Sequence, residues 1–250
     1  MDPDDLTTQS VAGDGTPLVF LHGWLGSTAS WQQVREHLNV DNPLLFYDQR
    51  CHGDSPCEAF DFDDLADDLH SLIEQHGFED PILAGHSMGG MVALTYAVNH
   101  DNLGGLFLLG TCASTPEPET GSPSYFLERF GEMDREEWAR TMVDNYTHET
   151  TAEAFREETV RQVVDAGATP IESGLRAMID YDVRPALDGL TVPASVIGGR
   201  HDKAITPEKV EELARLCGCE AEFLDAAHLL LQEAAEAVAG LLEQFVSQNQ

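Results

Sequence analysis

The sequence predicts an α/β fold in which a mostly parallel sheet is covered by helices on both faces. Short, continuously apolar runs, typical of strands that are buried on both faces, alternate with amphipathic stretches of helical period. The chain has 250 residues, of which 42% are hydrophobic. That is enough for one sizeable core and too short to require two independent domains.

The first part of the chain alternates predicted strands and helices. Apolar runs predict strands over residues 17–22, 43–48, 81–85 and 103–109. Amphipathic stretches predict helices over residues 28–38, 61–76 and 88–99. In the helix over 61–76, Asp61 is a suitable N-cap and Gly77 a suitable stop. Strands that are separated by helices in this way pair in parallel, so their carboxyl ends meet at one edge, where ligands bind.

The second part continues the pattern after a long interruption. It contains predicted strands over 192–198 and 221–224 and predicted helices over 207–217 and 228–246. The segment 112–185 lacks a buried strand; it opens with STPEPETGSPS and continues as three or four charged amphipathic helices. We therefore expect a core built from 1–111 and 186–250, with 112–185 inserted as a helical cap over the strand ends. The alternative is an ordinary set of surface helices.

The charge balance is strongly acidic. The chain has 45 acidic and 13 basic residues, a formal net charge of −32, and its lysines are Lys203 and Lys209. Such a field repels nucleic acid and anionic membranes, so we expect a small-molecule substrate and neither of those partners. Low lysine with pervasive Asp and Glu resembles proteins of salt-accumulating halophilic archaea, where a Debye length of roughly 3 Å screens the repulsion. An acidic protein from a low-salt organism is the alternative.

Location and cofactors follow from the termini and the cysteines. The segment MDPDDLTTQS is acidic and polar, unlike a signal peptide, and no apolar run approaches the ~20 residues of a membrane span. We therefore expect a cytoplasmic protein. The five cysteines lack the spacing of a zinc site, so reduced thiols, no metal and no cofactor are expected.

A serine surrounded by glycines follows the predicted strand 81–85. The pattern G-x-S-x-G is met by Gly85-His86-Ser87-Met88-Gly89, between an apolar strand and a predicted helix. This pattern is typical of a sharp strand-to-helix turn that exposes the serine in a strained backbone conformation. Gly85 and Gly89 are expected where strand and helix approach too closely for side chains. The alternative is a Gly-rich helix start with an incidental serine.

A serine hydroxyl needs a base, and the base needs an orienting carboxylate. His228 follows the last predicted strand, and Asp202 follows the strand 192–198, which gives the chain order Ser, Asp, His. Asp225 competes with Asp202, but it is only three residues from His228 and is not expected to reach the far ring nitrogen. Other histidines also lie near strand ends, so position alone does not select the base; they are His22, His52, His86 and His201. His86 should point away from Ser87, and loop hydrogen bonding is the alternative role of His22 and His52. We expect His22 and Gly23 to support the site without taking part in the reaction.

Acyl transfer also needs two N–H donors for the oxyanion of the tetrahedral intermediate. Met88, the residue after the nucleophile, supplies one of them. The loop His22-Gly23-Trp24-Leu25-Gly26 follows the first strong strand, and its Trp24 N–H is the candidate for the other.

Together these segments resemble the α/β-hydrolase superfamily, in its cap-bearing esterase and lipase-like branch. The matching segments, which extend from residue 19 to 233, are VFLHGWLGS, YDQRCHGDS, AGHSMGG, and GGRHDKAITP followed by AAHLLLQE. The resemblance implies Ser87 as nucleophile, Asp202 as acid, His228 as base, and Trp24 and Met88 as oxyanion donors.

The chain departs from the family pattern at several places. Cys51 stands where relatives have a glycine, which requires a backbone there that accepts a side chain, and Ala226-Ala227 replaces a glycine before the base. The segment before the first predicted strand is short, so one or both strands of the family's opening hairpin are expected to be reduced. A serine at the turn, in place of the aspartate of epoxide hydrolases and haloalkane dehalogenases, favours acyl transfer.

Three functions remain open from the sequence. The first is a serine hydrolase that cleaves a carboxylic ester or a related acyl bond. The second is an enzyme that uses the same residues for a proton-abstraction or lyase reaction, as in menaquinone-pathway relatives, or for cofactor-free peroxidation. The third is a non-catalytic small-molecule receptor. The choice of substrate depends on residues 112–185.

The charge balance predicts a stability that depends on salt. We expect the melting temperature to rise between about 0.1 M and 2 M KCl, because added ions screen the repulsion among the acidic side chains. Thermal unfolding followed by circular dichroism at several KCl concentrations measures this. A melting temperature that stays constant over the range would instead indicate an acidic protein adapted to low salt.

Overall fold

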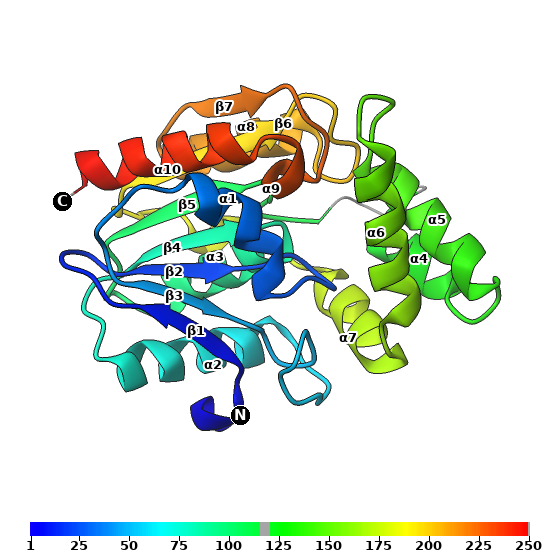
Figure 1. The fold of residues 1–250 in the computed structure, drawn as a ribbon, viewed down its shortest axis with the longest axis horizontal. Coiled ribbons are helices and arrows are strands. Elements are labelled where there is room, and N and C mark those ends of the chain that lie inside the picture. Colours follow the sequence, from blue (N-terminus) through cyan, green and yellow to red (C-terminus); the bar gives the residue numbers. More distant parts are fainter. Residues whose placement is uncertain (116–120, 250) are drawn as a thin grey trace.

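The computed structural model describes residues 1–115 and 121–249. Within them, a seven-stranded sheet has the order β1-β3-β2-β4-β5-β6-β7 (Figure 1). The strands are β1 (Thr8–Val11), β2 (Leu18–Leu21), β3 (Leu44–Tyr47), β4 (Ile82–His86), β5 (Gly105–Leu109), β6 (Ala194–Gly199) and β7 (Ala221–Leu224). Only the β1–β3 pair is antiparallel among these strands. The predicted mostly parallel sheet is confirmed.

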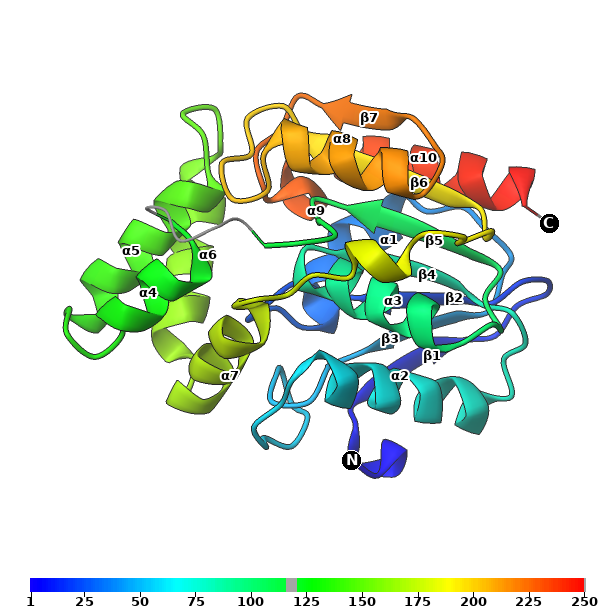
Figure 2. The same cartoon turned by 180° about the vertical axis from the view of Figure 1, so that it is seen from behind.

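Helices cover both faces of this sheet. One face packs against α1 (Gln32–His37), α9 (Leu230–Glu233) and α10 (Ala235–Gln248), which lie in front of the sheet in Figure 1. The other face packs against α2 (Phe62–His76), α3 (Met88–Asn99) and α8 (Pro207–Leu216), which lie on the viewer's side of the sheet in Figure 2. Every residue of β2, β3, β4 and β5 is buried, as expected for strands between two layers of helices.

Local sequence signals account for the ends of α2. The Asp61 carboxylate accepts a hydrogen bond from Asp64 N at 2.9 Å, and Asp61 N donates to the Asp64 carboxylate at 3.1 Å. This capping box satisfies two donors at the start of the helix. Gly77 ends the helix in the left-handed conformation, with φ 65°, which glycine adopts without steric cost. Both predicted ends of this helix are confirmed.

Several predicted boundaries differ from the structure. The helix predicted over 28–38 begins as a 3-10 turn, Thr28–Trp31, before α1. The helix predicted over 228–246 is divided into α9 and α10, because Ala234 leaves helical geometry with φ −138°. Before β2, the described chain has the 3-10 turn Pro3–Asp5 and the single strand β1, so the opening hairpin is reduced as expected.

Between β5 and β6 the chain forms a separate group of helices. They are α4 (Pro123–Arg129), α5 (Arg135–Tyr146), α6 (Glu153–Asp165) and α7 (Ala168–Met178); a 3-10 turn, Arg184–Ala186, follows. We call α4 to α7 the cap helices. They pack around an apolar cluster of their own that includes Trp138, Met142 and Ile171. Figures 1 and 2 show them gathered at one end of the sheet. Residues 116–120 of the predicted STPEPETGSPS linker lie outside the described residues.

The loop after β3 contains a cysteine in a left-handed conformation. Cys51 has φ 65°, in the left-handed region that favours glycine, so the cysteine side chain is accommodated there at a cost of about 1–2 kcal/mol. A disulfide joins Cys51 to Cys57, and Cys51 N donates to Pro56 O at 2.8 Å. The prediction that all cysteines are reduced is therefore wrong for this pair. The free thiols are Cys112, Cys217 and Cys219.

In the described residues, the helices are all too short or too polar to cross a membrane.

Candidate active site

Ser87 lies at the turn between β4 and α3. Its backbone has φ 52° and ψ −118°, a conformation that L-residues rarely adopt and that is typical of a nucleophile elbow. The turn is held on both sides: Ser87 N donates to Leu109 O of β5 at 2.9 Å, and Gly90 N donates to Ser87 O at 2.9 Å.

The glycines around Ser87 allow the sheet and α3 to approach each other. A Cβ at Gly89 would lie 2.3 Å from Leu21 O, at the end of β2. A Cβ at Gly85 would lie 2.6 Å from Gly89 O. Real side chains do not tolerate such distances, so this is the close approach expected of these two glycines.

The structure brings together three residues that are distant in sequence. Ser87 Oγ lies 2.9 Å from His228 Nε2, and Asp202 Oδ2 lies 2.7 Å from His228 Nδ1. His228 occupies the loop between β7 and α9, so it precedes the helix instead of starting it. The imidazole therefore has one nitrogen directed at the serine hydroxyl and the other at a carboxylate.

The two competing carboxylates have different environments. The Asp202 side chain is fully buried, and its Oδ1 accepts hydrogen bonds from Ala204 N at 2.8 Å and Ile205 N at 2.9 Å. Asp225 is exposed and lies 2.8 Å from His201 Nε2. Asp202 is thus held by its own loop with one oxygen left for His228, whereas Asp225 serves a different histidine.

The loop after β2 lies directly against the elbow. The parallel register pairs Leu21 of β2 with Gly85 of β4, so both strands end side by side. A Cβ at Gly23 would lie only 3.4 Å from Ser87 Cβ. Among the described residues, the N–H groups of Trp24 and Met88 have no protein acceptor, which leaves both available near the serine.

The buried side chain of His22 holds this loop through hydrogen bonds to the backbone. Its Nε2 accepts a hydrogen bond from Gln49 N at 3.0 Å, and its Nδ1 donates to Gly23 O at 2.8 Å. A nitrogen that accepts from a backbone N–H carries no proton, so the ring is neutral. Complete burial lowers the pKa of His22 to about 4, which agrees with that tautomer.

His86 has a structural role that the sequence did not suggest. In the described residues the His86 ring makes no hydrogen bond with the Ser87 hydroxyl, which lies against His228 instead, and His86 Nε2 donates to the backbone carbonyl of His228 at 2.9 Å. Burial and the neighbouring His228 lower the pKa of His86 to about 3, so it is a neutral donor. The residue beside the elbow therefore holds the loop that carries His228.

The cap holds the same loop from the opposite side. His228 N donates to Tyr146 O at 3.0 Å, and the two rings lie 5.0 Å apart. The Glu233 carboxylate accepts from Ala227 N at 2.6 Å and from the Thr151 hydroxyl at 2.8 Å. Sequence reasoning did not identify Tyr146, Thr151 or Glu233, because no local pattern marks contacts between segments about 80 residues apart.

Two recesses meet at Ser87, and they share Trp24, Tyr146 and His228. The first, which we call the α7 recess, has a mostly apolar lining from Met91, Pro123, Phe126, Leu175, Met178 and Ile205. The second, the α6 recess, adds hydrogen-bonding groups from Ser30, Thr159, Gln162 and Gln232. In the described part of the chain, no Arg, Lys, Asp or Glu lines either recess.

Within residues 1–115 and 121–249, no group of three or more His, Cys, Asp or Glu side chains is arranged to hold a metal ion.

Comparison with known proteins defines the family. The model of the alpha/beta hydrolase family matches residues 18–241, so the chain belongs to this family. It is similar to the AB hydrolase superfamily protein YisY of Bacillus subtilis, with 28% identity over 93% of this chain and 92% of that protein. It is also similar to pimeloyl-[acyl-carrier protein] methyl ester esterase of Vibrio atlanticus, with 27% identity over 82% and 83%.

Among solved structures, the chain is similar to a thermophilic esterase from Thermogutta terrifontis. The TM-score is 0.86 at 26% identity, covering 97% of this chain and 93% of the esterase. The α/β-hydrolase fold is thus shared over nearly the whole length, cap helices included.

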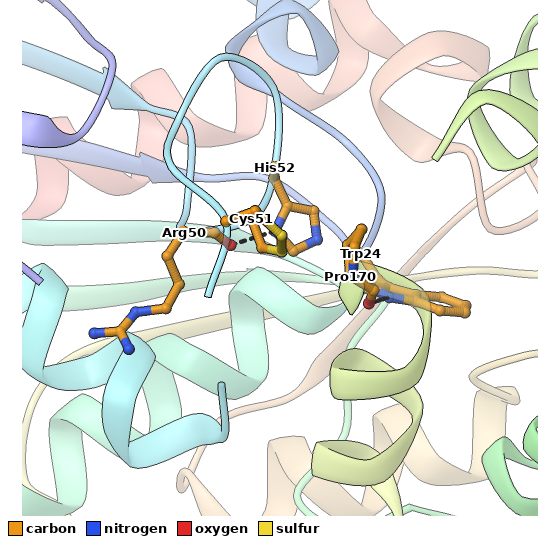
Figure 3. The surroundings of a disulfide bond; sticks show 6 residues. Trp24, Arg50, Cys51, His52 and Pro170 are labelled. Atoms are coloured by element: carbon orange, nitrogen blue, oxygen red, sulfur yellow. Dashed lines mark hydrogen bonds between the residues drawn. A yellow bond between two sulfur atoms is a disulfide. The ribbon is translucent and has the colours of Figure 1, made fainter. Parts of the chain in front are cut away.

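His52 is a further buried histidine near the site. Its Nδ1 donates to Arg50 O at 2.9 Å (Figure 3), its ring lies 5.2 Å from that of His22, and its Nε2 has no partner among the described residues. Burial, and secondarily the nearby His22, lower the pKa of His52 to about 3. The neutral ring is therefore the form that the folded protein stabilises.

These lowered pKa values make stability depend on pH. Between the unfolded pKa of 6.5 and the folded pKa of about 3, the unfolded chain binds a proton at His52 that the folded chain does not. Stability is thus present above pH 6.5 and falls as the pH is lowered. We expect His52→Asn, which keeps a donor for Arg50 O, to reduce the slope by about 1.4 kcal/mol per pH unit between about pH 4 and 6.

Urea unfolding at a series of pH values measures this slope. The control is His37→Asn, which removes an exposed imidazole at the end of α1. Equal slopes for the two variants and the wild type would show that the buried His52 is not coupled to unfolding.

Proposed function

We propose that this protein is a serine hydrolase that cleaves a carboxylic ester or a related acyl bond through an acyl-enzyme. The observation that carries the proposal is the position of His228, whose ring nitrogens lie 2.9 Å from Ser87 Oγ and 2.7 Å from Asp202 Oδ2. This arrangement provides a nucleophile, a base and an orienting carboxylate in hydrogen-bonding reach of one another.

In the first half-reaction, Ser87 Oγ attacks the carbonyl carbon while its proton passes to His228 Nε2. The buried Asp202 carboxylate holds Nδ1–H and stabilises the imidazolium that forms. The N–H groups of Trp24 and Met88 hold the oxyanion. Collapse of the tetrahedral intermediate breaks the bond to the leaving alcohol, which takes the proton from His228 Nε2.

In the second half-reaction, water attacks the acyl-enzyme. His228 accepts a proton from the water, the oxyanion forms again, and collapse releases the carboxylic acid. The proton returns to Ser87 Oγ, so the site is restored without any cofactor.

The linings of the two recesses support an uncharged substrate. The apolar α7 recess suits an apolar arm, and the α6 recess, with Gln162 and Gln232, suits an uncharged arm that can form hydrogen bonds. A net charge of −32 disfavours polyanionic substrates and both nucleic acid and anionic membranes as partners. The esterase relatives are consistent with this proposal.

The alternative functions, a lyase reaction, peroxidation and ligand binding without turnover, each predict a different experimental result. A lyase acting on a polycarboxylate would need basic residues, yet none lines the described parts of the recesses. Arg140, Arg156 and Arg184 form ion pairs with acidic neighbours instead. Peroxidation would appear as an acyl-enzyme that is resolved by hydrogen peroxide, and a receptor would bind ligand saturably without turnover.

The strongly acidic composition also supports a proposal about where the protein works. We propose that the protein works in the cytoplasm at multimolar salt, as in halophilic archaea, so its activity is to be measured in high KCl.

Labelling with a fluorophosphonate probe in high salt tests the nucleophile. We expect stoichiometric labelling of the wild type and none of Ser87→Ala, because the probe forms a bond only with an activated serine. Ser71→Ala, which removes a hydroxyl that donates to Asp67 O on α2, is the control and should label normally. An unlabelled wild type, or equal labelling of Ser87→Ala, would refute the serine hydrolase.

A pair of carboxylate variants tests the orienting acid. We expect Asp202→Asn to lower kcat for a short-chain acyl ester by about 10⁴-fold, because the amide favours the wrong imidazole tautomer. The matched control is Asp225→Asn, which removes the exposed carboxylate beside His201 and should leave kcat unchanged. The pH–rate profile of both variants completes the measurement, and a large loss in Asp225→Asn with little in Asp202→Asn would reverse the assignment.

A further inference from the structure

The loop His22–Gly26, which carries the proposed oxyanion donor Trp24, is attached to the cap through the side chain of Trp24. Trp24 Nε1 donates to the backbone carbonyl of Pro170, in the first turn of α7, at 2.9 Å (Figure 3). Residue 24 follows β2 in the core, whereas Pro170 belongs to the cap helices, so this bond joins two parts of the chain separated by 146 residues. The residue whose N–H is proposed to hold the oxyanion thus extends its ring into the cap.

The contact is also tight. Gly174, one turn further along α7, faces the indole: a Cβ at this position would lie 2.2 Å from Trp24 Nε1 and 2.5 Å from Trp24 Cδ1. Glycine in a helix costs about 1 kcal/mol relative to alanine, so an otherwise helical segment has a glycine where the ring needs its space. The ring therefore has a defined place between α7 and the core.

The neighbouring residues continue this attachment. Trp24 packs against both the large core cluster and the cap cluster, and Leu25 packs against the cap cluster. Leu25 has φ 59°, a conformation that is unfavourable for a leucine. A backbone in such a conformation persists only when surrounding contacts hold it, and here part of those contacts come from the cap.

We propose that α7 positions the oxyanion hole: the Pro170 carbonyl and the space at Gly174 fix the Trp24 ring and thereby the Trp24 N–H. This inference rests on the proposed acyl-transfer function and deepens it. Gly174 lines neither recess and touches no reacting atom, so it is a positioning residue and not a catalytic one. The effect of changing Gly174 should appear in the chemical step, because displacing an oxyanion donor reduces the stabilisation of the transition state more than the binding of the substrate.

Gly174→Ala is the main test. We expect kcat for a short-chain acyl ester in high salt to fall about tenfold to hundredfold with KM changed less than about threefold, since losing one oxyanion donor outright costs 10²- to 10³-fold. The affinity for a trifluoromethyl ketone should fall by the same factor as kcat/KM, because Ser87 converts that ketone into a hemiketal oxyanion. A merely structural change would not move these two quantities together.

Matched controls separate positioning from general damage. Gly240→Ala makes the same change in α10, where no atom lies within 4 Å of the new Cβ, and should keep wild-type kcat. Trp138→Phe removes an equivalent indole hydrogen bond inside the cap, to Phe126 O at 3.0 Å, and should also keep wild-type kcat. Trp24→Phe keeps an aromatic ring but loses the bond to Pro170 O, so its kcat should fall.

A double-mutant cycle closes the test. In the Trp24→Phe background Nε1, the indole atom nearest to Gly174, is absent, so adding Gly174→Ala should lower kcat by no more than about threefold. Additive losses, or a Gly174→Ala variant that behaves like Gly240→Ala, would overturn the inference while wild-type turnover leaves the proposed function intact. A wild type without labelling or turnover would instead overturn the proposed function.

Discussion

The backbone of Ser87, held at φ 52° and ψ −118°, is the constraint on which the rest of the site depends. Such a conformation costs about 1–3 kcal/mol and persists only when its surroundings require it. Here the requirement comes from the sheet: β5 accepts the Ser87 N–H, and α3 packs so closely against the end of β2 that Gly89 has no space for a Cβ. The strain at one residue is therefore offset by the packing of three central strands.

The loop that carries His228 is held mainly through its own main chain. The His228 carbonyl accepts a hydrogen bond from His86 in the core, and the His228 N–H donates to the Tyr146 carbonyl in the cap. The side chain is then free to point one nitrogen at Ser87 and the other at Asp202. Since both main-chain bonds are independent of the protonation of His228, the loop can stay in place while the imidazole gains and loses a proton.

Sequence reasoning predicted the sheet layers because buried strands and amphipathic helices have local periodicity; α3 and β7 have the predicted bounds. It placed Ser87, Asp202 and His228 at one edge because parallel strands end there. It treated His86 as uninvolved and missed Glu233, because their partners are fixed only by the folded arrangement of loops. It also expected a reduced Cys51, since a six-residue separation from Cys57 does not reveal that the loop folds back on itself.

The contacts between cap and core differ in how they would survive recombination within the family. The bond from His228 N to Tyr146 O involves only backbone atoms, so any residue at position 146 can provide it. The Thr151–Glu233 bond and the Trp24–Gly174 packing each need a particular residue on both sides. A cap transplanted from a relative would thus bring the first contact with it, whereas the other two would have to be inherited together with positions 233 and 24 of the core.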